Sequence, residues 1–227
     1  DNDDDAQFMV PVKFLRSNAD TTDRWWILTQ ADGSGTSGSA LFKSDGTALD
    51  STATITQDAI TGTPTDCVEN AVIFGAANAR DRLIVARDTD LALLNDGTAW
   101  DDDWWDVTLV QAALNANNPH YIYTFANLLL VPDGNVLHVI DDSDVVVANR
   151  ISLPDEYQIV WIADDGVRVF LGTRHIRGGD GLVFPWSNVT AGGKETYDEP
   201  IPIYSDISYF GVNKDGIMHT LNRKGQL

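Results

Sequence analysis

Cysteine is almost absent from this chain. Cys67 is the single cysteine among 227 residues, so no intrachain disulfide can form. The fold therefore does not depend on an oxidising compartment, although an extracellular location is not excluded. Because no histidine lies near it in the sequence, we interpret Cys67 as a small buried apolar side chain rather than a reactive nucleophile.

Basic residues and glutamate are also scarce. The chain has 15 Lys and Arg against 34 Asp and Glu, which gives a formal net charge of -19. This charge argues against direct binding of nucleic acid or of an anionic bilayer. Only four of the acidic residues are Glu, and 30 are Asp. Since Asp favours turns and Glu favours helices, the imbalance predicts a loop-rich β protein.

Long apolar runs are missing as well. No run approaches the roughly 18 residues of a membrane-spanning helix, and the N-terminal DNDDDAQF has neither the basic nor the apolar region of a signal peptide. We therefore predict a soluble chain with no membrane span. The chain begins without methionine, so we interpret it as processed or as part of a longer protein.

Asp-Gly pairs, by contrast, are abundant. Seven occur in the chain, and Asp-Gly between β-branched or aromatic runs is the strongest short-range signal of a β-hairpin, because both turn positions favour positive φ. The pattern is clearest in residues 157–186, where Asp165-Gly166 and Asp180-Gly181 separate three apolar runs. We predict a small antiparallel sheet there.

The hairpin pattern recurs along the chain. Five turns follow one another at a mean spacing of about 46 residues, which lies in the range of four-stranded propeller blades. They are centred at Asp32, Asp88, Asp133, Asp165 and Asp215. The interval from Asp133 to Asp165 is only 32 residues, too short for a full blade unless the register there is misread.

Apolar residues follow one another without alternation inside the predicted strands, as in Val160-Trp161-Ile162. This is expected of strands that are covered on both faces. We predict an all-β fold, a single β-propeller-like domain over residues 1–227 with about five degenerate antiparallel blades. Its ring would close by pairing of residues 8–15 with the hairpin at 217–221. A two-sheet β-sandwich or jelly roll is the alternative.

The acidic run DDDWWD at 101–106 is the first candidate site. Its carboxylates are those of Asp101, Asp102, Asp103 and Asp106. They are hard oxygen ligands of the kind that calcium prefers, but the run matches no EF-hand pattern, and a solvated acidic loop is the alternative. Calcium is the one cofactor that we keep open, and metal binding is otherwise unassigned. The residues that follow, 107–117, could form a short helix but end in the loop signal NANNP.

Two tryptophans inside this run are the second candidate. Trp104 and Trp105 stand beside four carboxylates on a connection, where an exposed pair would stack on a sugar ring or contact a partner protein. With Asp101 and Asp103 they form our candidate binding surface, and burial in the core is the alternative. Four further tryptophans lie in predicted strands and are assigned to the core: Trp25, Trp26, Trp161 and Trp186.

The sequence contains no assembled catalytic motif. It has no nucleophile elbow, phosphate-binding loop or dinucleotide fingerprint. The four histidines lie far apart and form no metal-binding pattern: His120, His138, His175 and His219. We interpret Asp141, Asp142 and Asp144 as an ordinary polar turn. We therefore predict no catalytic residue and no enzyme activity.

Paired carboxylates around the funnel of a propeller, as in some glycosidases, would be the alternative chemistry. Few glutamates are available for that role. Glu156, Glu195 and Glu199 all lie in predicted loops.

Blade-like motifs follow one another in the second half of the chain, 121–227. They are LPDEY at 153–157, WI at 161–162, VFLGT at 169–173, GG at 178–179, VFPW at 183–186 and NRKGQ at 222–226. In this order they resemble the degenerate propeller repeats of structural proteins of tailed bacteriophages and related viruses. No functional residue of that family is carried over to this chain.

This resemblance implies a non-enzymatic virion component of a tail, nozzle or fibre, located in the virion or outside the cell. Its partners would be other virion subunits, including further copies of this chain in a homo-oligomeric assembly, or a host receptor or glycan. The alternative function is that of a carbohydrate-active propeller, either a lectin or a glycosidase.

Overall fold

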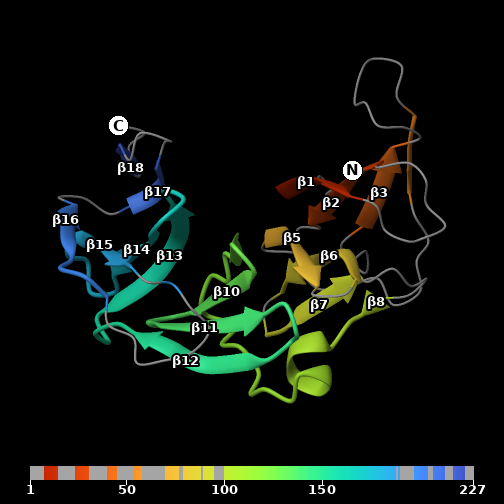
Figure 1. Cartoon of the computed structure of the whole chain (residues 1–227). Coiled ribbons are helices and arrows are strands. Elements are labelled where there is room, and N and C mark those ends of the chain that lie inside the picture. Colours follow the sequence, from red (N-terminus) through yellow and green to blue (C-terminus); the bar gives the residue numbers. More distant parts are fainter. Residues whose placement is uncertain are drawn as a thin grey trace. The chain divides into compact units, whose positions relative to one another are not determined.

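The computed structural model of the chain is all-β (Figure 1). It describes residues 8–14, 24–30, 40–44, 54–57, 70–76, 79–87, 89–94, 100–187, 189, 197–203, 207–212 and 217–222. The chain divides into two compact units, unit 1 (residues 1–116) and unit 2 (residues 117–227). Within the described ranges no helix is long and apolar enough to cross a membrane.

Unit 1 contains two four-stranded antiparallel sheets, and in each the neighbouring strands follow one another in the chain. Sheet 1 consists of β1 (Phe8–Phe14), β2 (Arg24–Gln30), β3 (Ala40–Ser44) and β4 (Ile55–Gln57). Sheet 2 consists of β5 (Asn70–Ala76), β6 (Ala79–Ala86), β7 (Leu91–Leu94) and β8 (Trp100–Asp101). A short π-helix, η1 (Trp104–Thr108), follows β8. Sheet 1 lies against sheet 2 because β1 packs on β5 and β6.

Unit 2 repeats this organisation. Sheet 3 consists of β9 (Tyr123–Phe125), β10 (Leu128–Asp133), β11 (Val136–Asp141) and β12 (Val146–Ser152). Sheet 4 consists of β13 (Tyr157–Asp164), β14 (Val169–His175), β15 (Gly181–Trp186) and β16 (Ile201–Ile203). The last two strands, β17 (Ile207–Val212) and β18 (Met218–Asn222), pair with each other as sheet 5.

The antiparallel sheet predicted for 157–186 is confirmed as β13, β14 and β15. Gly134 and Gly166 lie in the turns that follow β10 and β13, and their φ angles are 65° and 86°. Positive φ is the conformation that makes Asp-Gly a hairpin signal, since glycine adopts it without steric cost. The Asp-Gly pairs at Asp32, Asp45, Asp96 and Asp215 lie outside the described residues.

The interval between Asp133 and Asp165 is short because the two turns are not equivalent: the predicted alignment of the repeats is shifted by one strand between sheets 3 and 4. Asp133 lies between the second and third strands of sheet 3, whereas Asp165 lies between the first and second strands of sheet 4. The equivalent turn of sheet 4 joins β14 to β15 and contains Asp180, which is 47 residues after Asp133. The repeat length therefore fits one four-stranded sheet per repeat.

Sheet 4 is covered on both faces. On one side Ile162, Leu171 and Trp186 pack in a single cluster with Leu130 and Val139 of sheet 3. On the other side Ala163, Phe170 and Val183 pack with Met218 of β18. Ile162 and Ala163 are consecutive, so adjacent side chains of β13 enter different clusters, as the unbroken apolar runs predicted.

β1 pairs with β2, and β18 pairs with β17. The ring-closing pairing of 8–15 with 217–221 would join the two units and stays a prediction. The short helix considered for 107–117 does not form, because Val110 has a φ of 54°, which a right-handed helix cannot continue. A two-sheet sandwich of the whole chain also does not fit strands that are divided among five sheets.

Candidate functional site

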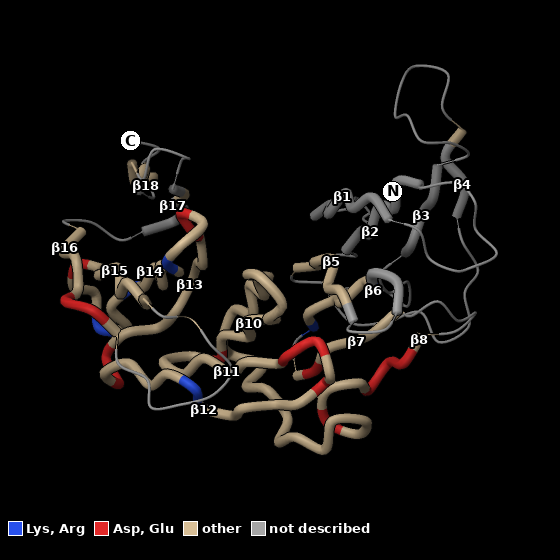
Figure 2. The backbone as a smooth tube through the Cα atoms, in the orientation of Figure 1, with Lys and Arg blue, Asp and Glu red and all other residues tan. Residues whose placement is uncertain are grey.

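The acidic run leads directly into η1. Asp101 ends β8, and Asp103 is the residue that precedes the helix. The carbonyl of Asp103 accepts the backbone N–H of Thr108 at 3.2 Å, and the carbonyl of Trp104 accepts that of Leu109 at 2.8 Å. These are i to i+5 hydrogen bonds, which define a π-helix, a rare element that often occurs at functional sites. Figure 2 shows acidic residues along the chain from β8 into this turn.

Trp104 and Trp105 are not exposed. Each is 1% exposed, and the indole N–H of Trp105 donates to the carbonyl of Ala112 at 2.7 Å. The guanidinium of Arg82 lies 5.6 Å from the ring of Trp104. The prediction of an exposed aromatic pair is therefore wrong. The wide π turn directs both indoles inward, while Asp103 remains exposed and the other three aspartates of the run remain partly exposed, a separation that the sequence run does not reveal.

The carboxylates of the run have different partners. Asp101 accepts the hydroxyl of Thr108 at 2.7 Å. Asp102 accepts the guanidinium of the buried Arg87 through both its side chain and its carbonyl. Asp103 is exposed. The four aspartates of the run therefore do not converge on one point, as a calcium site built from them alone would require.

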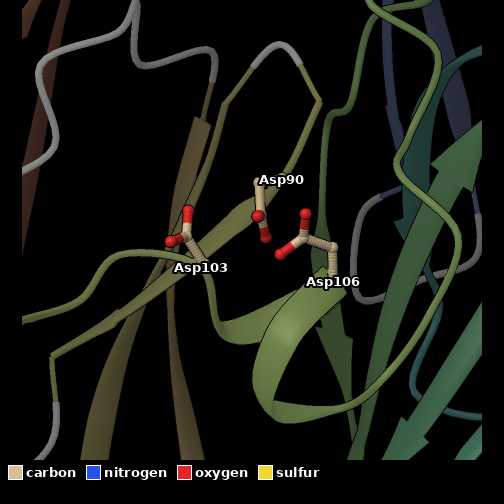
Figure 3. Close-up of side chains that lie close together, drawn as sticks. All are labelled: Asp90, Asp103 and Asp106. Atoms are coloured by element: carbon tan, nitrogen blue, oxygen red, sulfur yellow. The ribbon is translucent and has the colours of Figure 1, made fainter.

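The closest carboxylate group instead includes a residue from outside the run. Asp90, Asp103 and Asp106 each place a carboxylate oxygen within 4.8 Å of the others (Figure 3). Asp90 lies in the turn between β6 and β7 and is 4% exposed. Its Oδ1 accepts the backbone N–H of Leu91 at 2.6 Å and that of Trp105 at 3.0 Å. We call these three residues the Asp90 cluster.

Burial dominates the electrostatics of this cluster. It raises the pKa of Asp90 to about 7, with a further increase from the hydrogen bond and the charge of Asp106, against the opposing hydrogen bonds from Leu91 and Trp105. Oδ1 of Asp106 is buried and accepts no hydrogen bond within the described part of the chain. At neutral pH the Asp90 carboxyl group therefore carries a proton for a large fraction of the time.

The geometry limits what the cluster can do. A glycosidase needs two carboxyl groups on opposite sides of the bond that it cleaves, whereas Asp90 is buried and its carboxylate oxygen lies within 4.8 Å of that of Asp106. This pair therefore cannot flank a sugar. Three carboxylates are the right ligand type for calcium, which takes six to eight oxygens from carboxylates, carbonyls and water, so calcium binding at this cluster stays a prediction.

The Asp141 turn and the histidines near Asp133 are two further sets of residues that the sequence singled out. Oδ1 of Asp141 accepts the backbone N–H groups of Ser143 and Val145, so the polar turn predicted there is confirmed. His120 and His138, which form no motif in the sequence, both lie near Asp133, and Nε2 of His120 is 3.6 Å from the Asp133 carboxylate. Burial lowers the pKa of His138, and the charge of His120 lowers it further, while Asp133 opposes both.

Asp133 also belongs to a partly buried polar network in unit 2. Asn118 donates to Asp133 at 2.5 Å and accepts from Gln158 at 2.8 Å, and Gln158 in turn accepts from Arg174 at 2.8 Å. Because Gln158 and Arg174 belong to sheet 4 and Asp133 to sheet 3, the network joins the two sheets. No sequence motif predicts this network, since its members are up to 56 residues apart.

The remaining sequence candidates have less to contribute. His175 accepts the backbone N–H groups of Arg177 and Gly179 in its own turn, and His219 is exposed. Trp186 is in the core as predicted, whereas Trp161 is half-buried and stacks on Tyr121 with ring centroids 4.5 Å apart. Glu156 and Glu199 are exposed. Cys67, Glu195 and the side chains of Trp25 and Trp26 lie outside the described residues.

Comparison with known proteins adds no relative. No protein-family model matches the chain, and no curated protein matches it either.

Proposed function

We propose that the chain is a non-enzymatic structural module, built of propeller-type blades, that acts through the surfaces it presents to other proteins. The observation that carries this proposal is the repeated four-stranded antiparallel meander, with sheet 4 covered by neighbouring sheets on both faces. Radial stacking of such sheets is how a propeller buries both faces of its inner strands.

Contacts between consecutive sheets support a stiff frame. The backbone N–H of Ile159 in β13 donates to the carbonyl of Gly134, in the turn of sheet 3, at 2.8 Å. The hydroxyl of Tyr123 in β9 donates to Asp164 in β13 at 2.5 Å. Hydrogen bonds of this kind fix one sheet against the next more specifically than apolar packing alone. A frame of this kind holds surface loops in a defined arrangement, which suits an assembly component.

The sequence resemblance narrows the proposal to a virion component of a tail, nozzle or fibre. Several aspartates have structural partners, such as Asp141 in its turn and Asp165, which is bonded to Arg168. This use of carboxylates favours a scaffold over a catalyst. The lectin alternative loses the observation on which it depended, because Trp104 and Trp105 are buried.

The assignment to a virion is tested by labelling. Antibodies against the purified chain, detected with gold particles, should decorate one end of intact particles from a culture that produces the protein. Label confined to the particle-free fraction would contradict the proposal. The blade arrangement is tested separately by electron cryomicroscopy of the particle, in which successive sheets should be arranged around one axis.

The non-enzymatic, non-lectin assignment is tested on the purified chain. We expect no retention on a glycan array and no release of reducing sugar from glycans of the host surface. Binding that a free sugar competes away, or hydrolysis that one carboxylate substitution abolishes, would replace the scaffold with a carbohydrate-active protein.

A further inference from the structure

Three Asp-Gly pairs lie in the described part of unit 2, and they differ in what holds the aspartate. They are Asp133-Gly134, Asp165-Gly166 and Asp180-Gly181. Such a pair can react with itself: the backbone nitrogen of the glycine attacks the carboxyl carbon of the aspartate, and water leaves. The glycine has no side chain that would hinder this approach. The rate in a folded chain therefore depends on how freely the two groups can meet.

In the first turn of sheet 4 both groups are held. Asp165 accepts two backbone N–H groups at 3.0 and 2.7 Å and the guanidinium of Arg168 at 2.8 Å. The N–H of Gly166 is donated to the side chain of the preceding aspartate at 2.7 Å. Asp133 is held as well, because Asn118 donates to its carboxylate at 2.5 Å. In both pairs the aspartate has a structural role that keeps it away from the next backbone nitrogen.

The turn that precedes Asp180 is closed without this residue. The carbonyl of His175 accepts the N–H of Gly178 at 3.1 Å. Its ring nitrogen Nδ1 accepts those of Arg177 and Gly179 at 3.2 and 3.3 Å. Asp180 is exposed, and its carboxylate has no hydrogen bond or ion pair within the described residues. A histidine thus supplies the acceptors of this turn, and the aspartate is left without a structural role.

Gly181 begins β15 at a weakly paired end of the strand. β15 pairs with β14 only from Val183 onward, so Gly181 pairs with β16 alone. β16 has three residues, and its Pro202 has no N–H to donate. Local opening at the end of such a strand costs far less free energy than global unfolding. The glycine nitrogen can therefore be reached while the rest of sheet 4 stays folded.

We propose that Asp180-Gly181 is a site of spontaneous isoaspartate formation in the folded protein. The nitrogen of Gly181 bonds to the carboxyl carbon of Asp180, and its proton leaves with the carboxyl hydroxyl group as one water. Hydrolysis of the resulting cyclic succinimide takes up one water. When that water attacks the backbone carbonyl carbon, the main chain afterwards runs through the former side chain and is longer by one methylene group. Water is the only other reactant, and nothing is oxidised or reduced.

The modification would lie beside a surface turn. Ile176 is 57% exposed, and Arg177 is exposed as well. One additional backbone carbon between this turn and β15 displaces the start of the strand relative to its neighbours. The N–H of Leu182, which donates to the hydroxyl of Thr173 at 3.2 Å, is the nearest contact that this displacement weakens. The inference goes beyond the proposed function and does not depend on it, since the reaction concerns only residues of sheet 4.

Storage of the purified chain at neutral pH and physiological temperature tests the site, with isoaspartate located by digestion and mass spectrometry. We expect it to accumulate at Asp180 about tenfold faster than at Asp165 or Asp133. In urea, where the fold no longer distinguishes the pairs, the three rates should become similar. Asp180→Glu should abolish the product at this exposed position, since the longer side chain would have to close a larger ring. Arg168→Ala should speed the reaction at Asp165 and leave that at Asp180 unchanged.

Equal rates at Asp180 and Asp165 in the folded chain would overturn the proposal, as would no product at Asp180 under conditions in which the chain in urea forms it. Amide hydrogen exchange measures the structural consequence. The Leu182 amide should exchange faster in the stored wild-type chain than in the fresh one, and storage of Asp180→Glu should cause no such change. Unchanged exchange in chains that carry isoaspartate at this position would overturn the inferred displacement of β15.

Discussion

Asp90 in unit 1 and Asp165 in unit 2 both stand in hairpin turns between paired strands, but the pKa values of their carboxyl groups move in opposite directions. Burial, with the added effect of Asp106, raises the pKa of Asp90 to about 7. Burial also raises that of Asp165, but hydrogen bonds from the backbone and guanidinium of Arg168 and the backbone of Val167 outweigh it and lower the pKa.

The difference lies in the partner, not in the turn. Asp165 faces an arginine at i+3 that neutralises its charge, with an Nη2 to Oδ2 distance of 2.8 Å. Asp90 faces another carboxyl group. Their effects on stability therefore have opposite signs. The contribution of Asp165 is present above the ordinary pKa of an aspartate, about 4, and is lost as the pH falls. That of Asp90 is present at low pH and is lost as the pH rises from about 4 through about 7.

The largest expected effect extends this comparison from the turns to the two cores. Trp105→Ala in unit 1 and Trp186→Ala in unit 2 each remove a fully buried indole, so each should lower the free energy of unfolding by about 3–5 kcal/mol. Urea denaturation followed by circular dichroism measures this. Trp161→Ala, which removes a half-buried indole, is the control and should cost less. A loss of unfolding free energy below about 1 kcal/mol for Trp105→Ala would contradict the burial of Trp105 and favour the exposed position that the sequence predicted.

The second prediction sharpens the contrast between the turns at pH 8. Asp165→Ala loses hydrogen bonds from two backbone N–H groups and from Arg168, and should cost about 1–2 kcal/mol, with the partly exposed guanidinium contributing little. Asp165→Asn keeps an acceptor for the backbone groups and should cost less. Asp90→Asn removes a repelling charge and should be neutral or stabilising. Equal losses of unfolding free energy for Asp90→Asn and Asp165→Ala in denaturant titrations would contradict the opposite contributions of the two carboxylates.

A third prediction concerns the acid side of unit 2. Since burial lowers the pKa of His138 in the folded chain, the unfolded chain takes up the proton first, and stability should decrease as the pH falls below about 6.5. His120 and Asp133 face the same ring and are the groups that modify this value. Thermal unfolding between pH 7 and pH 5 should reveal the loss, and His138→Gln should reduce it. His219→Gln, at an exposed position, should leave the pH dependence of the wild type intact.

The smallest effect compares two residues with positive φ. Val110 in unit 1 and Asn149 in unit 2 have φ angles of 54° and 50°. This region is costly for a β-branched side chain and tolerated by asparagine. Val110→Gly should therefore stabilise unit 1 by about 0.5–1 kcal/mol, whereas Asn149→Gly should change the stability of unit 2 by a few tenths at most. A higher melting temperature for the first variant alone is the expected result, and a lower one would mean that the Val110 side chain makes contacts that offset its strain.

Local signals in the sequence predict the strands well. Asp-Gly between apolar runs gives the turns at Asp133 and Asp165, and the consecutive apolar residues of β13 give burial on both faces of sheet 4. The alignment of the repeats was harder to predict than the strands, because every strand pair of a meander produces a similar hairpin pattern. The second turn of sheet 3 and the first turn of sheet 4 therefore look alike in the sequence.

The candidate site was not predictable in the same way. Asp90 and Asp106 are 16 residues apart, and only the path of η1 brings them together. A run of aspartates beside two tryptophans suggests a solvent-exposed segment, but the π turn separates the buried indoles from partly or fully exposed aspartates within six residues. Contacts that depend on a rare helical geometry have no periodic pattern from which they can be inferred.

The strict chain order of the strands has a consequence for synthesis. Every described sheet is made of consecutive strands, so all of its backbone pairing closes short loops. Such a chain can complete one sheet after another as it leaves the ribosome, without waiting for a distant segment. Within each unit, a finished sheet then offers an apolar face on which the next sheet of that unit can pack, as β1 packs on β5 and as sheets 3 and 4 share one apolar cluster.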